Sequence, residues 1–103
     1  MSTKITRIYA SFLQKVSDYK FSLGNDNDRE VIEKTMYGYY VSARAEFYQC
    51  PKDLSTNQDE SDAYIESSLV IINDKLSEAE IEIIAMLMLV EYFRQIMIRN
   101  ETL

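Results

Sequence analysis

The segment DKLSEAEIEIIAMLMLVEYF, residues 74–93, constrains the fold most, because it starts as a helix and is then apolar on every side. Ser77 and Glu80 form an S-x-x-E capping box, in which each side chain satisfies a backbone N–H that the helix start leaves open. Leu76 before the cap and Ile81 after it have the spacing of a hydrophobic staple. We therefore predict a helix that begins at Ser77.

This helix carries two apolar stripes on roughly opposite sides. One faces the core and comprises Ile81, Ile84, Met88, Tyr92 and Ile96, flanked by Ala85, Leu89 and Phe93. The other comprises Ile83, Leu87, Val90, Arg94 and Ile98. Leaving a large apolar side chain in water forgoes about 1.5–3 kcal/mol, and a helix that is apolar all round is normally buried all round. Either the chain's own segment 63–72 wraps the second stripe, or another subunit or partner protein covers it.

Two further helices are predicted before it. The first runs from about Ile5 to Tyr19, and the second from about Asp28 to Gln49, ending before Pro51 because proline disfavours the helical state of the preceding residue. Turn formers at 24–27 separate them, and Asn27 or Asp28 is a natural N-cap. The apolar stripe of the first is Ile5, Ile8, Tyr9, Phe12, Leu13, Val16 and Tyr19, and that of the second is Ile32, Met36, Tyr39, Ala43 and Phe47.

The second helix has another stripe away from its core face, formed by Tyr37, Val41, Arg44 and Tyr48. Two interpretations stay open: the stripe is a second contact surface, or its tyrosines are simply tolerated at the surface. Gly38 lies in the middle of the helix, where glycine costs about 1 kcal/mol relative to alanine. Close packing against another helix would explain it.

The region between the second and third helices is not helical in pattern. We expect PKDLSTNQDESD to be a solvated loop, and AYIESSLVIIND to form an extended segment or a single turn against the helices, since periodicity does not separate the two. With only two glycines and one proline, a turn-rich β-sandwich is not expected. The predicted fold is all-α: one domain over residues 1–103, built as a small bundle of three main helices with a short extended or one-turn segment between the second and third.

Composition limits the function. The chain has 103 residues and a net charge of −6, without the clustered Lys and Arg that grip phosphates. It has no histidine, no glycine-rich phosphate loop and no acid/base pattern, and NDNDRE lacks the ladder of a calcium loop. We therefore expect neither an enzyme, a cofactor nor a metal site. Cys50 is the lone cysteine, which indicates a reducing compartment. The sequence shows no apolar signal region, and no stretch of about 18 apolar residues predicts a membrane span.

Three motifs in this order resemble a known family: FLQKVSDYKF, then AEFYQCPKDLS, then KLSEAEIEIIAMLMLVEYFRQI. They are similar to the small head–tail connector (neck, or head-completion) proteins of tailed bacteriophages of Gram-positive bacteria. The last motif matches best, through Leu76, Ser77, Glu80, Ile81, Ile83, Ile84, Ala85, Leu87, Met88, Glu91 and Tyr92. Phe47 and Cys50 match a Phe-x-x-Cys element near the end of the second helix.

The resemblance implies a structural virion assembly protein, made in the bacterial host cytoplasm and located in the neck of the virion. Such proteins form a ring, typically of twelve copies, beneath the portal protein. The ring extends the DNA channel and gives the tail or stopper protein a docking platform. A ring subunit needs two different side faces, and the two spare stripes are the candidates. Acidic side chains repel phosphates, so DNA would pass without specific binding.

One departure and one alternative accompany this interpretation. Such proteins usually continue past the position of Gln95 and Ile96 through a further polar helical region, whereas this chain ends at Leu103, so the role of that extension is not carried over. The alternative is a small acidic protein-binding regulator that imitates nucleic acid. It requires acidic side chains clustered on one face with the spacing of phosphates.

Overall fold

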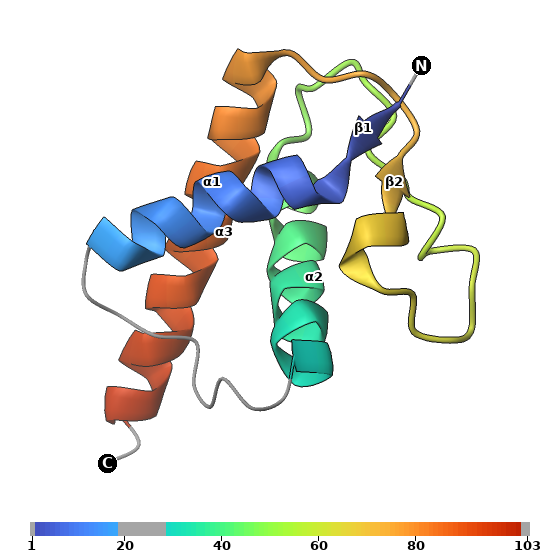
Figure 1. Ribbon diagram of the computed structural model, residues 1–103. Helices are drawn as coiled ribbons and strands as arrows, with labels where there is room; N and C mark the ends of the chain where they lie inside the picture. Colours follow the sequence, from blue (N-terminus) through green and yellow to red (C-terminus); the bar gives the residue numbers. More distant parts are fainter. Residues whose placement is uncertain (1, 19–28, 102–103) are drawn as a thin grey trace.

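The computed structural model describes residues 2–18 and 29–101. The elements in chain order are β1 (Thr3–Lys4), α1 (Ile5–Asp18), α2 (Arg29–Glu46), the 3₁₀ turn η1 (Ser67–Leu69), β2 (Ile71–Ile72) and α3 (Glu78–Glu101). Helices α2 and α3 run side by side in opposite directions, and α1 crosses both of them (Figure 1). The fold is therefore mostly helical, with three helices as predicted.

The expectation of an all-α fold was wrong in one respect, because a small antiparallel sheet joins the N-terminal residues to the segment before α3. Thr3 pairs with Ile72 and Lys4 with Ile71. On the other edge of β2, Thr56 forms an isolated bridge with Ile72. The segment before α3 thus contains both a single turn, η1, and an extended strand, β2, which confirms the prediction for this region. The two-residue strands are too short to give a sequence pattern.

The predicted helix boundaries agree with the structure at the start of α1 and differ from it at the end of α2. Helix α1 begins at Ile5, as predicted, whereas its predicted end at Tyr19 and the turn and N-cap residues 24–28 lie outside the described residues. Helix α2 ends at Glu46 rather than Gln49. The Cys50 N–H donates to the Phe47 oxygen at 3.2 Å, so a turn forms before the chain reaches the proline.

The hydrophobic core lies where α1 crosses α2 and α3. Leu13, predicted to belong to it, is instead exposed, so the buried stripe of α1 is narrower than its sequence suggested. The predicted core face of α3 is confirmed, although Phe93 and Ile96 are only partly buried. Buried residues from α1 are Ile5, Ile8, Tyr9, Phe12 and Val16, and those from α3 are Ile81, Ile84, Ala85, Met88, Leu89 and Tyr92.

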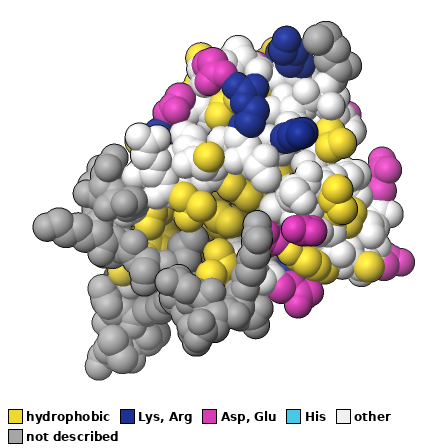
Figure 2. Space-filling view, viewed as in Figure 1, with side chains coloured by type: hydrophobic (Ala, Val, Ile, Leu, Met, Phe, Trp, Pro, Cys, Tyr) yellow, Lys and Arg dark blue, Asp and Glu magenta, His cyan; other side chains and the backbone are white. Residues whose placement is uncertain are grey.

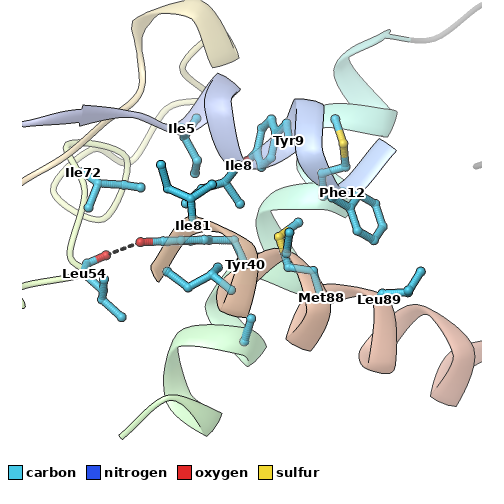
Figure 3. Packing of buried hydrophobic residues seen from close by; sticks show 14 of the residues in the cluster. Ile5, Ile8, Tyr9, Phe12, Tyr40, Leu54, Ile72, Ile81, Met88 and Leu89 are labelled. Carbon is cyan, nitrogen blue, oxygen red and sulfur yellow. Dashed lines mark hydrogen bonds between the residues drawn. The ribbon is translucent and has the colours of Figure 1, made fainter. Parts of the chain in front are cut away.

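Tyr40 is fully buried on α2, and Tyr39, the predicted core residue beside it, is partly buried and packs against the core. The Tyr40 hydroxyl donates a hydrogen bond of 2.7 Å to the Leu54 oxygen (Figure 3). Burial raises the pKa of Tyr40, so the hydroxyl keeps its proton and remains a donor. The phenol can be buried because the chain after α2 returns to supply this carbonyl.

We expect Tyr40→Phe to lower the free energy of unfolding by about 1 kcal/mol, the usual net value of a buried hydrogen bond. The ring and its packing remain, and the Leu54 carbonyl keeps a contact with the Arg44 guanidinium at 3.3 Å. Urea denaturation followed by circular dichroism measures the change. A variant as stable as the parent would show that this hydrogen bond does not hold the segment after α2.

Gly38 lies in the middle of α2, and a Cβ added there would meet no atom within 4 Å. Close packing within the subunit therefore does not explain it.

We expect Gly38→Ala to raise the free energy of unfolding by about 0.5–1 kcal/mol, because alanine loses less backbone entropy in a helix. Ala45→Gly, at an exposed position of the same helix, is the matched control and should cost a similar amount. A destabilised Gly38→Ala variant would contradict the open space around this residue.

Candidate interaction surfaces

The start of α3 is fixed by the predicted capping box. The Ser77 N–H donates to Glu80 Oε1 at 2.8 Å, and the Glu80 N–H donates to Ser77 Oγ at 3.1 Å. The bond from the Ser77 N–H and the Lys52 ammonium at 3.2 Å lower the pKa of Glu80. Leu76 and Ile81 are both buried on either side of the cap, as the predicted staple requires.

Strand β1 holds the approach to α3 from the other end of the chain. The Thr3 hydroxyl donates to the Asp74 oxygen at 3.0 Å and accepts from the Leu76 N–H at 2.8 Å. Thr3 is itself buried. These two bonds hold the residues just before α3 against β1.

The second apolar stripe of α3 faces outward. Ile83 is 43% exposed and Val90 is 47% exposed, while Leu87 is partly buried. The segment 63–72, which could have wrapped this stripe, packs instead on α1 through η1 and pairs with β1 through β2. We call the outward-facing residues the outer stripe: Ile83, Met86, Leu87, Val90, Arg94, Met97 and Ile98. Around its first half lies a shallow groove of about 260 Å³ with almost entirely apolar walls.

The predicted second stripe on α2 divides into two parts. The Tyr37 hydroxyl donates to Asp59 Oδ1 at 2.6 Å, and both Nη atoms of Arg44 contact the same carboxylate at 2.7 and 3.2 Å. These two side chains therefore bind the chain's own loop. Val41 and Tyr48 remain exposed, Tyr48 by 81%. The role of Val41 and Tyr48 in contacting another chain stays a prediction.

Asp59 is the centre of this attachment, since it also accepts a bond of 3.1 Å from the Thr56 N–H. Partial burial alone would raise the pKa of Asp59, but the hydrogen bonds from Arg44, Tyr37 and Thr56 outweigh it and lower the pKa to about 2. No local pattern indicates this arrangement, because Asp59 lies 15 and 22 residues from its two partners on α2.

The loop after α2 is more ordered than a solvated loop, so that expectation was wrong in part. Leu54 and Thr56 are buried. The Asn57 side chain donates a hydrogen bond to the Leu69 oxygen and accepts one from the Ile71 N–H, both at 2.9 Å. These two bonds take the place of those that a neighbouring strand would make with β2. The loop is therefore part of the sheet end of the molecule.

Replacing Asp59 by Asn tests the attachment of this loop through its pH dependence. Because folding lowers the pKa of Asp59 from about 3.8 to about 2, the ionised carboxylate stabilises the folded state above pH 4, and this contribution is lost as the pH falls towards 2. We expect Asp59→Asn to be less stable at pH 7 by about 1.5–3 kcal/mol, as for a hydrogen-bonded charged group. The difference from the parent should shrink between pH 4 and 2.

Urea denaturation of both proteins at several pH values measures this difference. A gap that stays constant down to pH 2 would contradict the lowered pKa. Asp62→Asn, at an exposed position of the same loop, serves as the control and should give no such gap at any pH.

Most of the acidic side chains near the helices have a basic neighbour. Glu78 pairs with Arg7, and Glu82 lies 2.6 Å from the Lys15 ammonium, so both connect α3 to α1. On the face shown in Figure 2, Lys and Arg lie in the upper part, acidic side chains lie at the upper left and along the right, and hydrophobic side chains are exposed below α1, between α2 and α3.

No family model, curated protein or solved structure matches this chain. Within residues 2–18 and 29–101, no helix has the length and apolar character that crossing a membrane requires. The same residues contain no group of three or more His, Cys, Asp or Glu side chains placed to share a metal ion.

Proposed function

We propose that this chain is a structural assembly protein that acts as a head–tail connector of a tailed bacteriophage, forming a ring with copies of itself between the portal protein and the tail or stopper protein. The motif resemblance suggests this class of protein. The single observation that carries the proposal is the outer stripe of α3, which the subunit leaves without a cover although it is large and apolar.

The size of the outer stripe supports contact with another chain. From Ile83 to Ile98 it extends along about 22 Å of helix, and its half-exposed side chains present on the order of 400 Å² of apolar surface, the scale of the largest patches on monomers. A standard interface buries about 800 Å² on each partner. The outer stripe alone is thus about half of such an interface, so neighbouring side chains must contribute the rest.

A second, different face is available on α2 for the head-to-tail contact that a ring requires. Val41 is exposed on α2, and Tyr48 is exposed in the turn that follows the helix. Tyr37 and Arg44 do not belong to this face, because they hold the loop at Asp59. Arg94 lies at the border between the two helices, 3.7 Å from Glu46 of α2 and 3.0 Å from Glu91.

The alternative, a regulator that imitates nucleic acid, has less support. It requires acidic groups in a continuous row, whereas Glu78, Glu82 and Asp59 are each paired with a cation of the same chain. Competition between this protein and DNA for a basic partner would favour the alternative. Indifference of the partner to the protein would count against it.

The connector proposal predicts that the double variant Ile83→Lys, Val90→Lys no longer assembles on the portal. Both residues are about half exposed, so the variant should fold with a stability within about 1 kcal/mol of the parent. Assembly should fail because burying two ammonium groups in an interface is costly. Purified portal rings are mixed with each protein and imaged by electron microscopy. The parent should add density beneath the portal, and the double variant should not.

Leu13→Lys is the matched control, because Leu13 is exposed to a similar degree on α1, away from the outer stripe. It should assemble like the parent. Circular dichroism and thermal unfolding of all three proteins separate loss of contact from loss of fold. A parent protein that adds no density to its portal would remove the proposal, and equal assembly of all three would remove the role of the outer stripe.

A further inference from the structure

The outer stripe has the spacing of a surface along which a second helix lies. Its positions follow one another at alternating intervals of four and three residues: Ile83, Leu87, Val90, Arg94 and Met97. An average interval of 3.5 residues is the heptad repeat of a coiled coil, whose seam stays against the partner helix along its whole length. A straight helix drifts by only about 20° per heptad from this repeat. The outer stripe therefore suits a long helix as its cover, and not a loop.

The surface is also hollowed where such a helix would lie. The groove around the first half of the outer stripe has Leu87 and Val90 in its lining, and so does a smaller hollow of about 30 Å³ between α2 and α3. This second hollow is also lined by Glu46 of α2 and by Arg94. Because the two hollows share lining residues, the concave surface continues from Glu82 to Arg94, about 18 Å along the helix.

The two ends of this concave surface carry opposite charges, with Glu82 at one end and Arg94 at the other. Each has an ion-pair partner in its own chain, yet the side chain of Glu82 stays 56% exposed and that of Arg94 stays 52% exposed. A helix of the same sequence that lies antiparallel brings its own arginine to the glutamate and its own glutamate to the arginine. A parallel helix would place like charges side by side, which is unfavourable.

An antiparallel second copy also matches the apolar positions. With a two-fold axis between Leu87 and Val90, Leu87 of each copy packs against Val90 of the other, as the a and d positions of an antiparallel coiled coil do. The next layer on either side joins Ile83 to the alkyl stem of Arg94, because an arginine stem packs on apolar surface while its charged head stays in water. One surface on each copy makes the whole contact, so the pair closes on itself.

The size of this contact indicates a weak pair. With on the order of 400 Å² from each copy, the two stripes bury about 800 Å² in total, below the roughly 1,200 Å² at which stable interfaces begin. Interfaces of this size belong to transient complexes. A neighbour that offers a larger surface can therefore displace the second copy.

We propose that free subunits pair through their outer stripes, with the two α3 helices antiparallel and a two-fold axis between Leu87 and Val90. An exposed apolar patch of this size otherwise favours aggregation. The pair keeps it out of water until a ring neighbour, which offers the α2 face and further side chains, replaces the second copy. This replacement rests on the proposed function, whereas the pair itself does not.

Sedimentation velocity of the parent protein, from about 10 µM to about 1 mM, tests the pair. We expect a reversible monomer–dimer equilibrium that is half dimeric at on the order of 100 µM, because the interface is small. A parent that sediments as a monomer at the highest concentration would overturn the inference. An average mass that grows past two copies would also overturn it, because a two-fold contact closes at two.

Arg94→Glu tests the charges. It places a carboxylate beside Glu82 of the second copy, so the dissociation constant of the dimer should rise about tenfold. Lys34→Glu, which makes the same change of net charge at an exposed position of α2, is the matched control and should change it less than about twofold. Circular dichroism checks that both variants fold. Equal dissociation constants for the two variants would overturn the antiparallel placement.

Disulfide cross-linking tests the register. In a Cys50→Ser background, Ile83→Cys and Arg94→Cys are oxidised separately and as an equimolar mixture. The two positions share one layer of the antiparallel pair, within the roughly 7 Å between Cα atoms that a disulfide spans. Two copies of either position lie about 16 Å apart along the axis. The mixture should therefore cross-link about tenfold faster than either variant alone. Equal rates, or faster reaction of the single variants as in a parallel pair, would overturn the register.

The pair and the connector function fail separately. A parent that stays monomeric and still adds density to the portal would overturn the pair and leave the proposed function. A dimeric parent that adds none would overturn the proposed function and leave the pair. Ile83→Lys, Val90→Lys should be monomeric at about 1 mM because each pair would bury four ammonium groups, whereas Leu13→Lys should dimerise like the parent. A double variant that dimerises like the parent would overturn the use of the outer stripe.

Discussion

Burial of one face of α3 beneath α1 and α2 is the constraint on which the rest of the structure depends. Because Ile84, Ala85 and Met88 are buried and fix the core face of α3, the opposite face of this helix points outward. Within residues 2–18 and 29–101, the other two helices, α1 and α2, both pack on the core side of α3. The exposed apolar surface is therefore a consequence of how the core is built, and no rearrangement of the outer side chains alone would remove it.

The features that came from local sequence were predictable. The capping box at Ser77 and Glu80 needs only three residues of separation, and the two stripes of α3 follow from the helical repeat. The burial of Tyr40 was not predictable in this way, because its partner, the Leu54 carbonyl, belongs to a loop that carries no periodic signal. Tyr39, which the helical repeat placed on the core face, packs against Phe12 and Tyr92 as that pattern predicts.

The attachment at Asp59 shows the same limit for the candidate contact surfaces. Helical spacing correctly placed Tyr37, Val41 and Arg44 on one side of α2, but spacing does not tell whether the neighbour is another chain or a loop of the same chain. An acidic residue in a polar segment looks solvated, and Asp59 differs from Asp62 only through the side chains that the fold brings to it.

The bonds made by Thr3 and Arg7 connect residues about 71 positions apart in a short chain. Contacts of such large sequence separation give a helical protein an unusually high contact order, and folding slows as contact order rises. Helix α1 has no complete surface to pack against before α3 has been synthesised. The amino-terminal third of the chain therefore remains unpacked until then. A nascent chain of this protein would therefore leave the ribosome with its first helix exposed and would reach its native topology only after α3 has been synthesised.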